Sequence, residues 1–250
     1  MSFIDLTVFL FGLIIGSFLN VAIYRIPREE SVAFPASHCP SCRQPIRWYD
    51  NIPLIGYLFL KGRCRSCLAS ISIRYPFVEL INGLGYIFLL KEFGLNWEWF
   101  AYSALYSSLV AITFIDLAHQ IVPDLITLPG MVIGVVFSST ILPTGFLNSL
   151  SGLFLGGALF YLVASLSRGG MGGGDIKLIA MVGAFTGWKA VLLTIFISAL
   201  AGSVLGIILM MFLGKSRKYP VPFGPFLALG AMISILWGSP IIYWYTHLGT

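Results

Sequence analysis

Charged side chains are scarce in this sequence. They make up 10% of its 250 residues, whereas a soluble domain carries about 25%. Hydrophobic residues account for 58% of the chain, and the mean hydropathy is +0.91. Because so few charges cannot cover a globular surface with polar groups, we expect the lipid bilayer to surround the chain. The composition therefore excludes an ordinary soluble domain and predicts an integral membrane protein.

A surface for nucleic acid is also missing, although the net charge is +5. Single-strand binding uses basic patches interleaved with aromatic side chains, whereas the basic residues here stand in short loops between apolar segments. If those segments alternate across a membrane, all of the 15 lysines and arginines except Lys91 and Lys189 fall on one side. This bias is typical of cytoplasmic loops. We expect no nucleic-acid partner, and we expect both termini on the outside.

Eight apolar segments predict an all-α membrane fold. A spanning helix needs about 20 mostly apolar residues. The segments cover residues 3–24, 76–91, 98–118, 121–142, 148–167, 175–187, 189–213 and 222–246. The sixth is short and meets the seventh at Gly187-Trp188-Lys189. The sequence thus predicts about eight transmembrane helices, organised as a first helix at 1–24, a cytoplasmic insert at 25–74 and a multi-helix domain at 75–250.

The chain has only four cysteines, and all of them lie in the insert. They form two pairs, Cys39-Pro-Ser-Cys42 and Cys64-Arg-Ser-Cys67. Two such pairs at this separation are typical of a four-cysteine zinc site. A segment too small for its own hydrophobic core can be stabilised by a bound metal ion. Two disulfides are the alternative, but a reducing cytoplasm argues against them. Four thiolates leave no open coordination position, so the zinc would be structural.

Acidic residues are equally few after Glu98, where only Asp116, Asp124 and Asp175 remain. All three are expected near the cytoplasmic ends of helices, and ionisable residues at membrane depth are usually functional. The run Gly172-Gly173-Gly174 before Asp175 lets the backbone turn sharply and approach another segment.

Two carboxylates that lie close together tend to share one proton, so that one serves as base and the other as acid. This favours Asp116 and Asp175 as an acid–base pair. The alternatives stay open: Asp116 as a helix-end anchor and Asp175 as an ordinary helix-entry residue. Asp124 follows Pro123 and is expected to cap the next helix.

Further short motifs follow one another along nearly the whole chain. They are Gly16-Ser17-Phe18-Leu19-Asn20-Val21, Tyr24-Arg25-Ile26-Pro27, the two cysteine pairs, Asn51-Ile52-Pro53-Leu54, Arg74-Tyr75-Pro76-Phe77-Val78-Glu79-Leu80, Ile115-Asp116, Pro123-Asp124, Gly172-Gly173-Gly174-Asp175-Ile176-Lys177 and Pro222-Phe223-Gly224-Pro225. With these motifs in this order, the sequence resembles the type IV prepilin peptidases, also called prepilin leader peptidase/N-methyltransferases.

The resemblance implies an aspartyl protease of the bacterial inner membrane. Such an enzyme removes a short basic leader, after a glycine, from the precursors of type IV pilins and type II secretion pseudopilins. Carried onto this chain, the catalytic residues are Asp116 and Asp175, and Asp124 matches an aspartate of lesser role. Many members also methylate the new N-terminal amine with S-adenosylmethionine, and the cysteine insert is typical of those members. Because no G-x-G-x-x-G motif follows a strand, the residues that would bind the methyl donor stay unidentified.

Other classes of protein remain as alternatives at this point. A transporter would have broken helices along a substrate path, with polar groups near the midplane, but the acidic residues here gather at one face. A zinc hydrolase would need ligands around an open metal position, yet His38, His119 and His247 stand in unrelated places. A peptidase without methylation and a non-catalytic scaffold are the remaining candidates.

Overall fold

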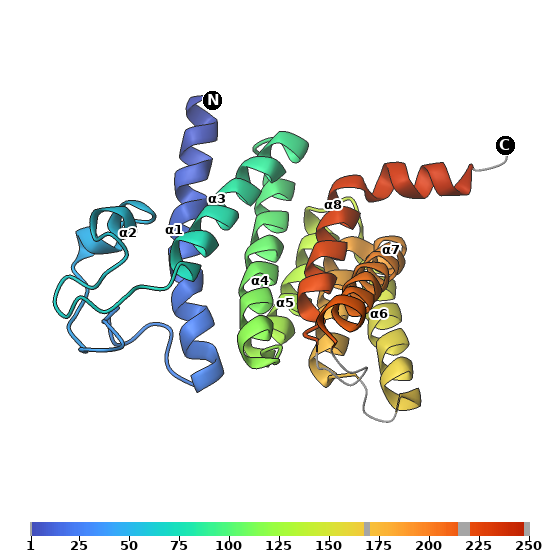
Figure 1. Ribbon diagram of the computed structural model, residues 1–250. Coiled ribbons are helices and arrows are strands. Elements are labelled where there is room, and N and C mark those ends of the chain that lie inside the picture. Colours follow the sequence, from blue (N-terminus) through green and yellow to red (C-terminus); the bar gives the residue numbers. More distant parts are fainter. Residues whose placement is uncertain (1, 168–170, 215–220, 248–250) are drawn as a thin grey trace. The chain divides into compact units, whose positions relative to one another are not determined.

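The computed structural model describes residues 2–167, 171–214 and 221–247 (Figure 1). Apart from two isolated β-bridges, the regular structure of these residues is helical. The helices are α1 (Phe3–Arg25), η1 (Ile26–Arg28), η2 (Trp48–Asn51), α2 (Ile55–Phe59), α3 (Arg74–Phe93), α4 (Trp97–His119), α5 (Asp124–Thr140), α6 (Phe146–Leu166), α7 (Gly173–Leu213) and α8 (Gly224–Thr246). The long helices match the predicted apolar segments within a few residues, so the all-α prediction is confirmed.

Five helices of the described chain are long and apolar enough to cross a membrane. They are α1 together with η1, α4, α6, α7 and α8. Helix α5 is apolar but shorter. Helix α3 is not among the five, and it carries charged side chains at Arg74, Glu79, Lys91 and Glu92. The protein is therefore a multi-pass membrane protein.

Helix α7 is interrupted where the sequence predicted a boundary between two segments. Gly187 has φ 79° and ψ 175°, which is outside helix geometry and in a region that favours glycine. Near this break, the hydroxyls of Ser138 and Ser149 donate to the carbonyl of Ala184, at 2.7 and 2.6 Å. Such side-chain partners are what an irregular backbone needs in a bilayer, because no water is there to satisfy it.

The chain forms two compact units, Met1–Ala111 and Ile112–Thr250, with the boundary inside α4. In the second unit, α7 packs against α5, α6 and α8. Close approach of α6 and α7 depends on glycine, because a Cβ atom at Gly152 would lie 2.5 Å from the carbonyl oxygen of Gly183. Small residues at helix contacts are the usual way that membrane helices pack.

In the first unit, α1 and α3 pack antiparallel in a defined register. A Cβ atom at Gly16 would lie 2.7 Å from the Cα of Glu79, so these helices also meet through glycine. One end of the pair is fixed by an ion pair between Lys91 Nζ and Asp5 Oδ1, at 2.6 Å. Toward the other end, the Asn20 amide donates to the backbone carbonyl of Tyr75 at 3.0 Å.

The insert between α1 and α3 has almost no core of its own. Of residues 26–73, all of which are described, only Cys39 and Gly56 are buried. An ion pair of 2.6 Å between Arg65 Nη2 and Asp50 Oδ1 joins η2 to the second cysteine pair, and hydrogen bonding to Arg65 holds the pKa of Asp50 below its usual value. The expectation that this segment is too small to fold by hydrophobic burial is confirmed.

Candidate functional site

Asp116 lies in the last turn of α4 and is buried. Its Oδ2 accepts a hydrogen bond of 2.8 Å from the backbone N–H of Gly224, the first residue of α8. The first N–H groups of a helix have no partner within the helix, and the dipole there favours negative charge. The N-terminus of α8 is therefore built to hold the Asp116 carboxylate, a contact that the sequence did not predict.

Asp175 lies in the first turn of α7 and is half-buried. Like Gly224 in α8, Asp175 stands at the N-terminus of a helix, where the positive end of the helix dipole lies. The two carboxyl groups lie within electrostatic reach of each other. Both belong to the second unit. The structure thus places both aspartates at helix ends of the second unit, and their action as a catalytic pair stays a prediction.

Asp124 does not cap α5, and that expectation was wrong. Pro123 is the N-cap residue and Asp124 is the first residue of the helix. The Asp124 carboxylate instead receives two hydrogen bonds from Lys177 Nζ, at 2.6 and 2.7 Å. Lys177 was counted only among the cytoplasmic charges, yet this contact fastens the first turn of α7 to the start of α5.

The four cysteines of the insert form one cluster. None is in a disulfide, and their sulfur atoms all lie within 4.8 Å of one another. The sulfurs of Cys39 and Cys67 are 3.9 Å apart, while a tetrahedron with Zn–S bonds of about 2.3 Å requires about 3.8 Å. The donor set and its spacing therefore fit a metal ion.

Two family models cover most of the chain. Residues 10–93 match the Bacterial Peptidase A24 N-terminal domain, and residues 103–207 match the Type IV leader peptidase family. A prepilin leader peptidase/N-methyltransferase of Aeromonas salmonicida (strain A449) is 38% identical over 268 residues, which cover 95% of this chain and 92% of that protein. Proteins of the same name from Pseudomonas aeruginosa and Legionella pneumophila are each 36% identical, over 98% and 97% of this chain and 94% of their own length. No solved structure matches the chain.

The chain belongs to the type IV prepilin leader peptidase/N-methyltransferase family. It is therefore an enzyme, and the resemblance seen in its motifs is confirmed. Within this prepilin peptidase the boundary between the two matched families falls between α3 and α4, close to the division into two compact units. The cysteine cluster lies in the first matched region, whereas Asp116 and Asp175 lie in the second.

The two cysteine pairs of this prepilin peptidase are built alike. The N–H of Cys39 donates to the carbonyl of Gln44, and the N–H of Cys64 donates to the carbonyl of Ala69. Each turn also has a residue with positive φ four positions after its first cysteine, 58° in the first pair and 60° in the second. Backbone N–H groups of Cys67 and Ser66 lower the pKa of the Cys64 thiol to about 6, which favours the thiolate that metals bind. The backbone N–H of Ala69 acts in the same way on Cys67, but burial and the neighbouring thiols outweigh it and raise the pKa of Cys67 to about 11.

The glycine run before Asp175 contains one position that the prepilin peptidase needs and one that it does not. A Cβ atom at Gly174 would lie 2.7 Å from the Cβ of Val122, whereas one at Gly173 would have nothing within 4 Å. We predict that Gly174→Ala displaces the start of α7 and lowers cleavage by about 100-fold, as expected for a misplacement of about 1 Å. Gly173→Ala is the matched control and keeps activity near wild type. Equal rates of prepilin cleavage in the two variants would contradict this role for Gly174.

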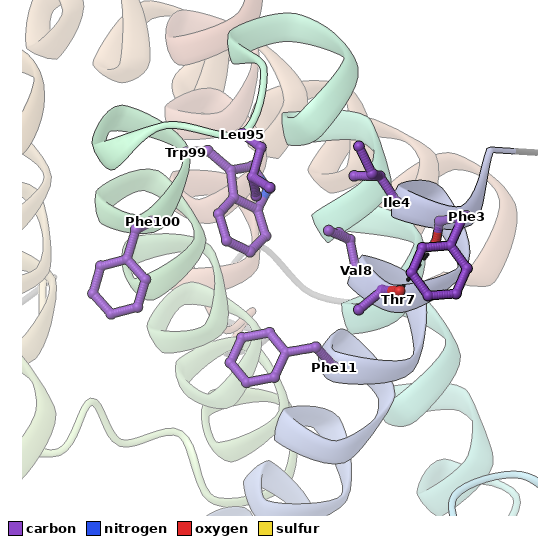
Figure 2. A pocket seen from close by; sticks show the side chains of 8 residues that line it. All are labelled: Phe3, Ile4, Thr7, Val8, Phe11, Leu95, Trp99 and Phe100. Carbon is purple, nitrogen blue, oxygen red and sulfur yellow. Dashed lines mark hydrogen bonds between the residues drawn. The ribbon is translucent and has the colours of Figure 1, made fainter.

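A hollow of about 440 Å³ in the first unit is not a candidate active site (Figure 2). It lies between α1 and the start of α4, and its lining is apolar apart from two groups. The Thr7 hydroxyl donates to the Phe3 carbonyl, and the Trp99 indole N–H donates to the Tyr86 carbonyl. Both polar groups are thus satisfied by backbone, so this part of the prepilin peptidase offers no acid, base or ligand.

Proposed function

We propose that this chain is a membrane aspartyl endopeptidase that cleaves the basic leader from type IV prepilins and type II secretion pseudopilins after a glycine. The observation that carries the proposal is the position of Asp116 and Asp175 at helix ends of the second unit, within electrostatic reach of each other, in the part of the chain that matches the leader peptidase family. The hydrogen bond from Gly224 to Asp116 supports it, because a fixed donor distinguishes one carboxylate from the other.

In the proposed reaction, the two aspartates share one proton. Asp116 is the base, since the N–H of Gly224 stabilises its charge, and it takes a proton from the attacking water. Asp175 holds the shared proton and gives it to the carbonyl oxygen of the scissile bond. The hydroxyl adds to the carbonyl carbon and gives a gem-diol intermediate. The intermediate collapses when Asp116 gives its proton to the leaving amine and Asp175 takes a proton back from one hydroxyl of the gem-diol. Both carboxyl groups then return to their starting state, as in aspartic proteases.

We propose eight passes through the bacterial inner membrane, with both termini outside and with the insert and the aspartates toward the cytoplasm. The break at Gly187 supports this count, because α7 has 41 residues and a single pass needs about 20. Helices α3 and α5 supply the other two passes beyond the five candidate spans. Four of the predicted cytoplasmic charges, Arg168, Lys215, Arg217 and Lys218, lie outside the described residues.

The same charge rule places the substrate. A basic leader stays in the cytoplasm, and the apolar helix that follows it lies in the bilayer against the enzyme. The cleavage site between them then falls near the membrane surface, at the level proposed for Asp116 and Asp175. The bilayer is thus a partner that presents the bond to be cut.

We further propose that the enzyme methylates the new N-terminal amine with S-adenosylmethionine, which supplies the methyl group when bound. The hollow in Figure 2 does not fit this donor, because its apolar lining cannot match charged amino, carboxylate and sulfonium groups. We therefore assign no residues to the methyl donor and derive no step through it.

The metal that best fits the four cysteines is zinc in a structural role. Binding of structural zinc supplies about 10–16 kcal/mol in small domains, and the insert has little else to hold it. We predict that Cys39→Ser or Cys67→Ser loses the metal and impairs methylation more than cleavage. Zinc content by mass spectrometry checks this, with Ser41→Ala in the same turn as control. Wild-type zinc content in the cysteine variants would contradict the proposal of a four-cysteine zinc site.

The direct test of function uses the purified chain and a prepilin with a basic leader, followed by mass spectrometry. Loss of the leader is expected with the enzyme alone. A further gain of one methyl group is expected when S-adenosylmethionine is added. Cleavage without that gain would leave a peptidase only, and an uncut prepilin would contradict the proposed substrate.

A further inference from the structure

The α1–α3 pair provides a scale of depth in the membrane. Asp5, paired with Lys91, marks one end of α1, and Arg25 marks the other. Along an α-helix these two positions are separated by about 30 Å, which is also the approximate thickness of the hydrocarbon core. Because charged groups avoid the hydrocarbon, these side chains lie at its two edges.

The insert does not stay beyond the end of α1. The backbone N–H of Leu54 donates to Glu79 Oε2 at 2.8 Å, and Glu79 lies opposite Gly16 of α1. Gly16 is about 13 Å from Arg25 along the helix. Arg74, the first residue of α3, is about 8 Å from Glu79 along that helix. Leu54, and α2 directly after it, therefore lie inside the edge marked by Arg25 and Arg74. In Figure 1, α2 is seen at a level between the two ends of α1.

The contact between Leu54 and Glu79 supplies the hydrogen-bond partner that a non-helical backbone group needs inside the membrane. Leu54 has φ 60° and ψ −48°, so its backbone is neither helix nor strand. A non-helical N–H group at membrane depth must find a partner within the protein. Glu79 is buried and supplies that partner. Glu79 thereby holds the insert against α3.

The surface of α2 is suited to lipid. Leu58 is 71% exposed and Phe59 is 81% exposed, although the helix has only five residues. Lys61 and Arg63 follow at once and are exposed too. An apolar tip with a basic rim is the pattern of segments that sit in a membrane interface and contact anionic headgroups.

We propose that α2 is embedded in the leaflet on the insert's side and binds phospholipid there, with Leu58 and Phe59 among the acyl chains and Lys61 and Arg63 at the phosphates. The occupant is lipid rather than the leader of a prepilin, because the leader and this rim have charge of the same sign. The insert is joined at its two ends to helices α1 and α3. It is therefore held at the bilayer whether or not a substrate is present.

A matched pair of phenylalanines tests the proposal. Phe34 is 80% exposed, almost the same as Phe59. However, Arg25 donates to the carbonyl of Pro35 at 2.7 Å, which holds Phe34 at the end of α1. The full chain, carrying photoreactive p-benzoylphenylalanine at position 59 or at position 34, is placed in vesicles of phosphatidylethanolamine and phosphatidylglycerol and irradiated. We expect several-fold more lipid crosslinked through its acyl chain at position 59 than at position 34.

Wild-type zinc content and prepilin cleavage in both variants show that each is folded, independently of the lipid result. Since both side chains are exposed, replacement disturbs no core. Equal or greater crosslinking at position 34 would overturn the proposal. Capture of added prepilin at position 59, with loss of the lipid adduct, would overturn it as well and would identify α2 as a substrate-docking surface instead.

Discussion

Replacing either Asp116 or Asp175 by asparagine is expected to abolish leader cleavage while the protein remains in the membrane. Asparagine keeps the size of the side chain and the acceptor for the Gly224 N–H, but it cannot carry a proton between water and the peptide bond. General acid–base catalysis contributes about 10²- to 10⁴-fold for each group, so loss of one member stops turnover. The alanine variants should be equally inactive.

Asp124→Asn is the matched control for this experiment. Its carboxylate is exposed and pairs with Lys177, and exposed ion pairs contribute only about 0–1 kcal/mol. We therefore expect a change of a few-fold at most. The measurement is the initial rate of prepilin cleavage in vesicles at equal amounts of membrane-inserted enzyme. Significant residual cleavage in the Asp116 or Asp175 variant would mean that the catalytic pair lies elsewhere.

Gly224→Ala should also slow prepilin cleavage strongly. A Cβ atom at this position would lie 2.8 Å from Asp116 Oδ2 and 3.3 Å from its Cγ. The carboxylate would have to move away from the N–H that holds it, and an error of about 1 Å in a catalytic group costs about 100-fold in rate. We expect a loss of that order in the rate of prepilin cleavage, with normal insertion into the membrane.

Gly206→Ala controls for the general effect of adding a methyl group, because nothing lies within 4 Å of that position in α7. Alanine in a helix interior is even favoured over glycine by about 1 kcal/mol. If Gly224 acts through Asp116, the double variant Gly224→Ala with Asp116→Asn should be no worse than Asp116→Asn alone. Additive losses would show that Gly224 acts on something else.

The sequence predicted most of the helices because an apolar run of about 20 residues has few other solutions in a bilayer. The break at Gly187 was predictable for a similar reason, since α7 is too long for one pass. The cysteine spacing likewise predicted the cluster. These features depend on residues near one another in the chain.

What the sequence did not predict are the contacts between distant residues. Gly224 reaches Asp116 across 108 positions, and Lys177 reaches Asp124 across 53. No local pattern encodes such a pairing. The motif Pro222-Phe223-Gly224-Pro225 drew attention to Gly224 but did not indicate its partner. For Asp124 a local rule gave the wrong prediction. The sequence position favoured a helix cap, but Pro123 is the N-cap residue and the Asp124 carboxylate pairs with Lys177 instead.

The break in α7 also determines how far the enzyme's helices extend through the lipid. From Gly187 back to Asp175 the helix rises only about 18 Å, and the 17 residues of α5 cover about 25 Å. Both are shorter than a hydrocarbon core of about 30 Å, and short helices are accommodated by thinning of the bilayer around them. We expect such local thinning of the bilayer beside the second unit. It would let water reach the aspartates and would place a peptide bond at the cytoplasmic end of a substrate helix outside the hydrocarbon core. Hydrolysis could then proceed without a water channel through the protein.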